Sequence, residues 1–199
     1  MIGLIDYGLG NINAFSNILR SLNINFIIPK NCNEIEKCQK FILPGVGAFD
    51  EAVIKIKNLN YFNDLEENVL VKKKNILGIC VGMQVFLQKS DEGISKGLGW
   101  IEGSVKKFIL DKRVPHMGWN NLLLENRFNI LDNIETNEFY FLHSYYCDVK
   151  NKNIICTNTQ YSEKFCSIFV DKNIYGVQFH PEKSHDGGKN LIKNFIFNT

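Results

Sequence analysis

Asn75-Ile76-Leu77-Gly78-Ile79-Cys80-Val81-Gly82-Met83-Gln84 is the stretch of sequence that decides the fold. Its apolar first half predicts a β-strand, and the residues from Val81 to Gln88 are typical of the start of a helix. Cys80 lies between the two, with a glycine two residues away on each side. A strand, a sharp turn and a helix with a thiol at the apex form a nucleophile elbow, which exposes a reactive atom above a sheet.

Each part of this turn has a chemical reason. Gly78 and Gly82 lack the Cβ atoms that would collide where the strand and the helix approach each other. A thiol at a helix N-terminus lies near a partial positive charge, which favours the thiolate. The amide of Val81, left free by the first helical turn, can bind an oxyanion. The alternative is a buried core cysteine, because free cysteine is among the most buried residue types.

The composition indicates one domain that spans residues 1–199. Hydrophobic residues make up 45% of the chain, and the net charge of +2 gives no electrostatic case for binding nucleic acid or a membrane. No apolar run approaches the ~20 residues of a membrane span, and the N-terminus is typical of a first strand, not of a signal peptide. The six cysteines form no C-x-x-C pair, so we expect no metal, no cofactor and a reducing, cytoplasmic setting.

The first half of the chain alternates apolar runs with helical periodicity. The runs that predict strands are Ile2–Ile5, Asn25–Ile28, Phe41–Leu43 and Asn75–Ile79. The segments that predict helices are Asn11–Leu22, Phe49–Asn58 and Tyr61–Lys73. This alternation is typical of an α/β fold with a mainly parallel sheet and helices on both faces. Ligands of such sheets bind beyond the carboxyl ends of the strands, where Cys80 lies.

The second half changes character to strands joined by short turns. The predicted strands are Trp100–Leu110, Glu138–Val149, Ile154–Gln160, Phe165–Val170 and Ile174–Phe179. A final helix is predicted over about Gly188–Phe197. We therefore expect an antiparallel β excursion that ends in one more strand of the core sheet.

A second short motif supplies a candidate base for the thiol. His180 ends the last predicted strand and opens His180-Pro181-Glu182. Pro181 restricts the backbone, and a carboxylate two residues on can reach the second ring nitrogen of the histidine. The alternative for His180 is a solvent-exposed histidine at a strand end. Two other histidines, His116 and His185, have no assigned partner and are expected to be structural.

Pro44-Gly45-Val46-Gly47 forms a loop after a short strand. Glycines here let backbone amides turn toward an anion or a carbonyl oxygen. The loop lacks the length and the lysine of a phosphate-binding P-loop. A plain strand-to-helix turn is the alternative.

Together these motifs resemble the class I, triad-type glutamine amidotransferases. Asp6–Asn11, the Pro44–Gly47 loop and Val114–Asn120 narrow the resemblance to the glutaminase subunits of imidazole glycerol phosphate synthase. The match runs in register from Ile2 to the last helix. It implies a flavodoxin-like α/β fold in a single amidotransferase domain over residues 1–199, and an enzyme that hydrolyses L-glutamine.

The resemblance also implies roles for individual residues. Cys80 resembles the nucleophile that forms a glutamyl thioester, His180 the base, and Glu182 the group that orients the base. The amides of Val81 and, after a loop adjustment, Val46 or Gly47 resemble the oxyanion hole. The residues that resemble contacts to glutamine are Gly45, Gln84, His143, Ser144 and Tyr145.

A further set of residues resembles the face that meets a partner protein. They are Pro115 to Asn120, above all Met117, Trp119 and Asn120, with Tyr140 and Lys183. The implied partner is a (β/α)₈-barrel cyclase in a heterodimer, which receives ammonia through a tunnel. The cyclase converts PRFAR, a ribonucleotide intermediate, to imidazole glycerol phosphate and AICAR in histidine biosynthesis.

Two other functions stay open. A paralogous amidotransferase would supply ammonia to a related synthase in another pathway, such as surface-sugar amination, and would share the same glutaminase chemistry. The second open function is that of a stand-alone cysteine hydrolase, or of a binding module on a similar fold. Glu182 and the segment around Trp119, expected to be a loop, argue against a hydrolase that needs no partner.

Overall fold

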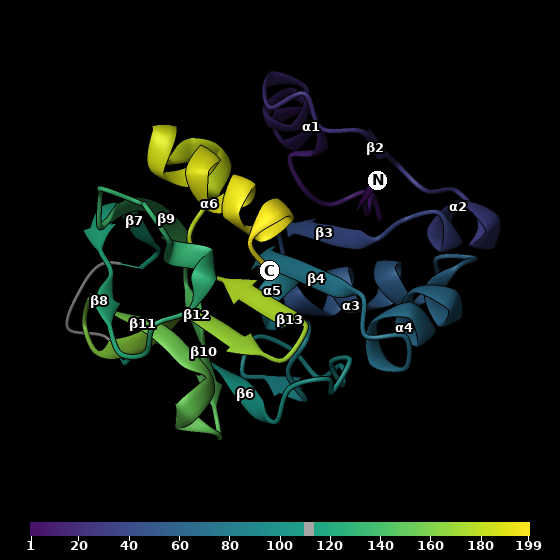
Figure 1. Cartoon of the computed structure of the whole chain (residues 1–199). Helices are drawn as coiled ribbons and strands as arrows, with labels where there is room; N and C mark the ends of the chain where they lie inside the picture. Colours follow the sequence, from purple (N-terminus) through teal and green to yellow (C-terminus); the bar gives the residue numbers. More distant parts are fainter. Residues whose placement is uncertain (110–113) are drawn as a thin grey trace.

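The computed structural model describes residues 1–109 and 114–199 of the chain. Its central sheet contains a parallel half, whose strands lie side by side in the order β2-β1-β3-β4-β13 (Figure 1). Their bounds are β1 (Ile2–Leu4), β2 (Phe26–Ile27), β3 (Lys40–Gly45), β4 (Asn75–Cys80) and β13 (Ile174–Val177). All four pairings among them are parallel. This is the flavodoxin-like order, with the last strand of the chain as the fifth, and it confirms the predicted fold class.

Helices cover both faces of this parallel half. Their bounds are α1 (Ile12–Ser21), α2 (Cys32–Glu36), α3 (Phe49–Lys57), α4 (Phe62–Leu70), α5 (Val81–Gln84) and α6 (His185–Phe197). Figure 1 shows α1 and α6 on one side of the sheet and α3 and α4 on the other. The apolar spacing in α1 buries Phe15 and Leu19, and Asn11 caps its first turn. The short helix α2 was not predicted.

The second half extends the sheet with antiparallel strands. β12 (Lys164–Asp171) pairs with β13 and with β10 (Tyr145–Val149), and β10 pairs with β6 (Gly103–Lys107). The outer strands are β5 (Lys89–Ser90), β11 (Ile155–Gln160) and β8 (Leu123–Leu124). Three short 3₁₀ turns of the described chain are η1 (Asn129–Leu131), η2 (Lys152–Ile154) and η3 (Pro181–Lys183). The predicted antiparallel excursion is therefore confirmed.

The single predicted strand Glu138–Val149 is wrong, because the chain leaves one sheet and enters another at Ser144. β9 (Glu138–His143) pairs with β7 (His116–Asn121) in a separate two-stranded sheet. β10 then joins the central sheet. Met117 to Trp119, which the sequence predicted to be a loop, therefore lie in a strand. The polar residues of β7 are accommodated because one of its faces is turned to solvent.

Two other predicted boundaries are corrected. The helix after Cys80 ends at Gln84 and does not continue to Gln88, because the chain turns there into β5. The turn is held by the amide of Leu98, which donates to the Val85 carbonyl at 2.8 Å. The predicted strand Trp100–Leu110 is shorter, Gly103–Lys107, and Leu110 itself lies outside the described residues.

The parallel register brings three strand ends to one place. Gly45 at the end of β3 lies opposite Cys80 at the end of β4. Val177 at the end of β13 lies opposite Ile79, so His180 follows three residues beyond the same edge. Loops at the carboxyl ends of neighbouring parallel strands form the usual crevice of an open α/β sheet. The fold thus gathers at one edge three segments that are far apart in sequence.

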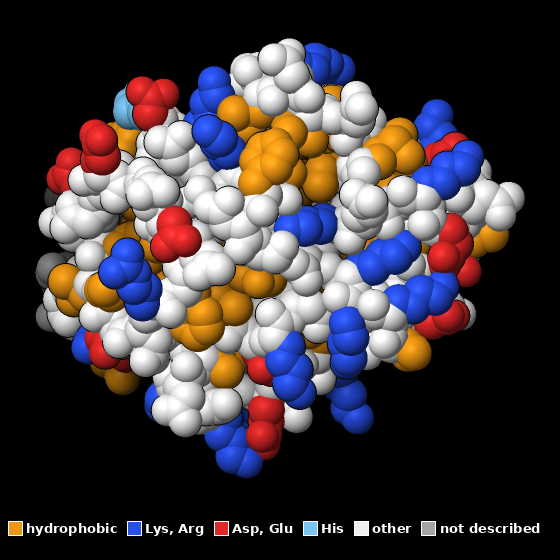
Figure 2. All heavy atoms as spheres, in the orientation of Figure 1, with side chains coloured by type: hydrophobic (Ala, Val, Ile, Leu, Met, Phe, Trp, Pro, Cys, Tyr) orange, Lys and Arg blue, Asp and Glu red, His pale blue; other side chains and the backbone are white. Residues whose placement is uncertain are grey.

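The described part of the chain contains no helix long and apolar enough to cross a membrane. Lysine and arginine side chains are interspersed with acidic ones on the face shown in Figure 2. This mixture agrees with the small net charge of +2.

Candidate active site

Cys80 is held in a strained turn between β4 and α5. Its backbone has φ 55° and ψ −112°, in a region that residues other than glycine rarely adopt. A Cβ on Gly82 would lie 2.0 Å from the Leu43 carbonyl oxygen, and one on Gly78 would lie 2.4 Å from the Gly82 oxygen. Both glycines are therefore required by close approach, as predicted. The side chain of Cys80 is nearly buried, with 4% of the residue exposed.

His180 and Glu182 form a buried pair beside the thiol. The imidazole Nδ1 lies 2.9 Å from Glu182 Oε1, and both side chains are almost completely buried. Burial alone would lower the pKa of His180, but the hydrogen bonds and charges of Cys80 and Glu182 outweigh it and raise that pKa to about 10. The site therefore favours an imidazolium between two acidic groups. This arrangement can hold a thiolate and later supply a proton.

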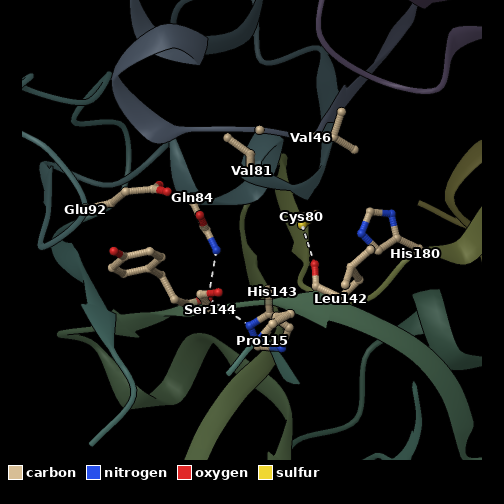
Figure 3. Close-up of a pocket in the computed structure, with 12 residues that line it drawn as sticks. Val46, Cys80, Val81, Gln84, Glu92, Pro115, Leu142, His143, Ser144 and His180 are labelled. Carbon is tan, nitrogen blue, oxygen red and sulfur yellow. Dashed lines mark hydrogen bonds between the residues drawn. The ribbon is translucent and has the colours of Figure 1, made fainter. Parts of the chain in front are cut away.

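A cavity of about 260 Å³ opens in front of the thiol (Figure 3). It suits a substrate the size of one amino acid. The lining residues come from the ends of β4 and β9, from α5, from the start of β10, from the segments that follow β3 and β13 and from nearby loops. They are Val46, Gly47, Cys80, Val81, Gln84, Glu92, Pro115, Leu142, His143, Ser144, Tyr145 and His180. The predicted nucleophile and base, the predicted oxyanion residues and most of the predicted substrate contacts thus share one cavity.

β3 continues through Pro44 and Gly45, which the sequence predicted to be part of a loop, and the two residues after it, Val46 and Gly47, border this cavity. Gly47 has φ +95°, and a Cβ there would meet nothing within 4 Å, so its backbone conformation is what favours glycine. Gly45, a predicted substrate contact, is not among the lining residues. A Cβ on Gly45 would lie 2.4 Å from the Gly82 amide nitrogen and 2.6 Å from the Tyr7 hydroxyl. Gly45 therefore allows β3 to pack against the elbow.

Several groups of the site were not predicted. The Leu142 carbonyl lies 3.9 Å from Cys80 Sγ, and Gln178 Nε2 lies 3.7 Å from the same sulfur. Glu92 also lines the cavity, and its carboxylate accepts a hydrogen bond of 2.9 Å from the Phe49 amide. β13 ends at Val177, but alternation continued from the predicted strand Ile174–Phe179 puts Gln178 on the same face as His180, and this signal could have identified it. The contact of the Leu142 backbone carbonyl has no such signal in the sequence, because every residue carries a carbonyl group.

Gln84 and His143 meet at the carbonyl oxygen of Tyr145. Gln84 Nε2 donates to this oxygen at 2.9 Å, and it also donates to Gln178 Oε1 at 3.0 Å. His143 Nδ1 lies 2.8 Å from the same carbonyl. Burial lowers the pKa of His143 to about 3, so its ring is neutral at physiological pH. Ser144, between the two strands, also lines the cavity.

Four of the five residues singled out as partner contacts, Met117, Trp119, Tyr140 and Lys183, lie together on neighbouring segments of β7, β9 and η3. Met117 and Trp119 project from the outer face of β7 and are 62% and 46% exposed. Trp119 stacks on His185 with ring centroids 5.0 Å apart, and its ring meets Tyr140 edge-on. Lys183 Nζ lies 5.6 Å from the centre of the Tyr140 ring. We call Met117, Trp119, Tyr140, Lys183 and His185 the docking face, after the partner contact that the sequence predicted for the first four of them.

Asn120 is placed differently from the other residues of this set. Its side-chain amide turns inward and donates to the Gln160 carbonyl at 3.0 Å. The same nitrogen lies 3.1 Å from His116 Nε2. Asn120 therefore connects β7 to the interior and is not part of the docking face.

The docking face is joined to the catalytic segment through the backbone. The His180 amide donates to the Tyr140 carbonyl at 2.8 Å. The Ser184 hydroxyl accepts from the Tyr140 amide and donates to the His180 carbonyl, at 3.0 and 2.7 Å.

Among the described residues, no group of three or more His, Cys, Asp and Glu side chains could hold a metal ion.

Comparison with known proteins gives one consistent result. The family model described as glutamine amidotransferase class-I matches residues 3–199. The imidazole glycerol phosphate synthase subunit HisH of Leptospira borgpetersenii is 44% identical over 98% of each chain. A protein named subunit HisH 2 of the same synthase, from Methanococcus maripaludis, is 43% identical, again over 98% of each chain.

The solved structures that resemble the chain share its fold. One is PurLQS from Thermotoga maritima, with a TM-score of 0.71. It is 14% identical in sequence, and the match covers 98% of this chain and 96% of the other.

Proposed function

The chain belongs to the class-I glutamine amidotransferases and, within them, to the HisH subunits of imidazole glycerol phosphate synthase, and from this membership we propose how its site works. It is a glutaminase subunit. In the proposed mechanism it hydrolyses L-glutamine to glutamate and ammonia at Cys80. The observation that carries this mechanism is the thiol on its strained turn, with the buried His180–Glu182 pair beside it at one cavity.

The first half-reaction forms a covalent bond to sulfur. The Cys80 thiolate attacks the carboxamide carbon of glutamine, and the carbonyl oxygen takes up the negative charge. The amide of Val81 and an amide of Val46 or Gly47 stabilise this oxyanion, a contribution typically worth about 10²–10³ in rate per donor. His180 protonates the departing nitrogen, the C–N bond breaks, and ammonia leaves a glutamyl thioester on Cys80.

The second half-reaction returns the free enzyme. His180, now neutral, takes a proton from water, and the water oxygen attacks the thioester carbon. Glutamate leaves, and the thiolate–imidazolium pair is restored. Glu182 holds the ring of His180 in one orientation through both steps.

The ammonia is proposed to pass to a cyclase of (β/α)₈-barrel form that binds the docking face in a heterodimer. The support is the relatives' name, which describes them as subunits of a synthase, together with the exposed aromatic cluster beside the cavity. The cyclase would use the ammonia to convert PRFAR to imidazole glycerol phosphate and AICAR, in the cytoplasm.

A second candidate keeps the chemistry and changes the partner. One relative carries a numbered name, HisH 2, which separates it from another HisH chain. A paralogous amidotransferase that supplies another synthase would have the same site. Copurification of a tagged form of this chain from its own cells, with identification of the bound barrel, separates the two.

The experiment that tests the proposed function is a glutaminase assay on the complex with the cyclase and its ribonucleotide substrate. Cys80→Ala should lower the rate at least about 10³-fold, because the nucleophile acts together with its base. Cys32→Ser, at an exposed cysteine, is the matched control and should keep the wild-type rate. Glutamine hydrolysis that survives in Cys80→Ala would rule out the mechanism.

A further inference from the structure

Three polar side chains form a hydrogen-bonded chain from β7 to the substrate cavity. Asn120 Nδ2 lies 3.1 Å from His116 Nε2, and His116 Nδ1 lies 3.1 Å from His143 Nε2. His143 Nδ1 lies 2.8 Å from the Tyr145 carbonyl. His116 and His143 are paired residues of the β7–β9 ladder, so the chain crosses from one strand to the other.

The partners at the two ends determine where the protons lie. A carbonyl oxygen only accepts, so His143 Nδ1 carries the proton and its Nε2 is an acceptor. His116 must then donate from Nδ1, and its Nε2 accepts from the amide of Asn120. All the bonds point in one direction, from Asn120 towards Tyr145.

Packing alone does not require polar rings at these positions. His116 is 3% exposed and is sandwiched between Phe141 and Tyr161, with ring centroids 4.9 and 4.1 Å away. Phe108 and Phe165 also lie against His143, one tilted and one edge-on, with ring centroids 5.4 and 5.1 Å away. Phenyl rings would fill this space without the desolvation that two imidazoles suffer. The polar atoms are therefore tolerated for the hydrogen bonds that they make.

The chain ends where the substrate binds. The Tyr145 carbonyl receives His143 Nδ1–H and one N–H of Gln84, while the other Gln84 N–H is donated to Gln178. Both donors of Gln84 are thus occupied, and its Oε1 is the remaining polar atom. Figure 3 shows Gln84 beside the cavity, with its nitrogen directed toward this carbonyl. An acceptor held there is suited to an N–H group of a bound amino acid.

We propose that His116 is a positioning residue for glutamine binding, which acts through His143 to hold the Tyr145 carbonyl and Gln84 at the edge of the substrate cavity. The role rests on the proposed glutaminase function and deepens it. His116 does not touch the substrate or the reacting atoms. It supplies the donor that keeps His143 in the tautomer in which Nδ1 bears the proton.

Two substitutions separate the hydrogen bond from the packing. His116→Phe keeps the ring between Phe141 and Tyr161 and removes both nitrogens. His116→Asn loses the ring but keeps an N–H close to the position of Nδ1. Both are measured in the complex with the cyclase and its ribonucleotide substrate, with L-glutamine as the varied substrate, and the thermal midpoint of each variant is recorded.

The two variants should differ in KM and not in kcat. His116→Phe should raise the KM for glutamine about tenfold, the equivalent of one neutral hydrogen bond in a buried network, with kcat within about threefold of wild type. His116→Asn should bring KM back to within about threefold of wild type, although it is the less stable protein. A purely structural role predicts the reverse ranking.

Three outcomes overturn the proposal: a wild-type KM in His116→Phe, an equal rise of KM in both variants, or a fall confined to kcat. If His116→Phe does not fold, Asn120→Ala replaces it, because it removes the first donor of the chain from outside the aromatic cluster. An unchanged KM in Asn120→Ala then overturns the proposal. Absence of glutaminase activity in the wild-type complex would instead contradict the proposed function.

Discussion

Cys80 combines backbone strain with burial at the atom that the proposed mechanism makes the nucleophile. Its φ of 55° is maintained because β3, β4 and α5 pack too closely at Gly45, Gly78 and Gly82 for any other path of the chain. The strain directs the thiol toward the cavity and toward His180. Nucleophilicity at this position therefore depends on residues that never meet the substrate.

His143 makes the stability of the protein depend on pH in the acid range. Its pKa is lowered from 6.5 to about 3 by burial, so below pH 6.5 the unfolded chain takes up a proton that the folded protein does not. Unfolding is then favoured as pH falls, by up to about 1.4 kcal/mol per pH unit. His180 adds little to this slope over pH 4–6, because its raised pKa keeps it protonated in the folded protein and its ordinary pKa of 6.5 keeps it mostly protonated in the unfolded chain.

The measurement is the free energy of unfolding by urea at several values between pH 4 and 6. His143→Asn should reduce the slope of this free energy against pH by about 1.4 kcal/mol per unit, since it removes the group that titrates. Parallel slopes for the two proteins would mean that His143 is protonated in the folded state.

At the residue scale, the sequence predicted the groups that belong to short contiguous motifs. Cys80 lies two residues from each of its glycines, and His180 lies two residues from Glu182. Spacings this short largely determine how the residues lie relative to one another. Gln178 and the Leu142 carbonyl were missed, because their relation to the sulfur arises only when β9 and β13 come together. His116 was expected to be structural, and its contact with His143 could not be inferred from spacing.

Among the elements, the short segment from His180 to Ser184 connects the base to β9. The Ser184 hydroxyl is buried and bonds to both the Tyr140 amide and the His180 carbonyl. Ser184→Ala should lower the free energy of unfolding by about 1–3 kcal/mol, because it leaves a buried amide without its partner. It should also lower kcat for glutamine hydrolysis, since the His180 carbonyl loses the hydrogen bond that helps to position this residue. Urea denaturation and the glutaminase assay check the two effects.

Ser162 provides the control for this substitution. Its hydroxyl is buried and has no hydrogen-bond partner within the described part of the chain. Ser162→Ala should therefore change the free energy of unfolding by less than about 0.5 kcal/mol and leave kcat unaltered. Equal losses in the two variants would show that the hydrogen bonds of the Ser184 hydroxyl add nothing to the stability.

The elements of the first half were predicted well because apolar runs and helical spacing alternate cleanly there. The second half was harder for a specific reason. Residues 138–149 form one continuous strand-like pattern, and nothing in it marks Ser144 as the point where the chain changes sheets. The helix from Val81 was likewise predicted too long, since its end depends on Leu98, a residue fourteen positions beyond Gln84 along the chain.

At the scale of the whole molecule, we expect the docking face to supply much of the binding energy of the proposed complex with the cyclase. Trp119 is an exposed aromatic residue stacked on His185, which is the kind of side chain that dominates binding energy at interfaces. Trp119→Ala should weaken binding of the cyclase about 30-fold or more, the equivalent of about 2 kcal/mol. Isothermal titration calorimetry with the purified cyclase measures this change.

Leu124→Ala is the matched control, because Leu124 is 63% exposed on β8 and lies outside the docking face. It should leave the dissociation constant within about twofold of wild type. If Trp119→Ala binds the cyclase as tightly as the wild type does, the interface must lie on another surface. The alternation of strands and helices predicted a mainly parallel sheet, and the family resemblance predicted Met117, Trp119, Tyr140 and Lys183 as partner contacts. The stacking of His185 on Trp119 was not predicted, because it depends on how β7 packs against the start of α6.

The hydrogen bond from the His180 amide to the Tyr140 carbonyl has an evolutionary consequence. In the proposed complex Tyr140 faces the cyclase and His180 faces glutamine, and this hydrogen bond joins their backbones. A substitution that moved the backbone at Tyr140 to suit a different synthase would then also move the proposed base. In that complex, a change of partner and the rate of ammonia release would be inherited together.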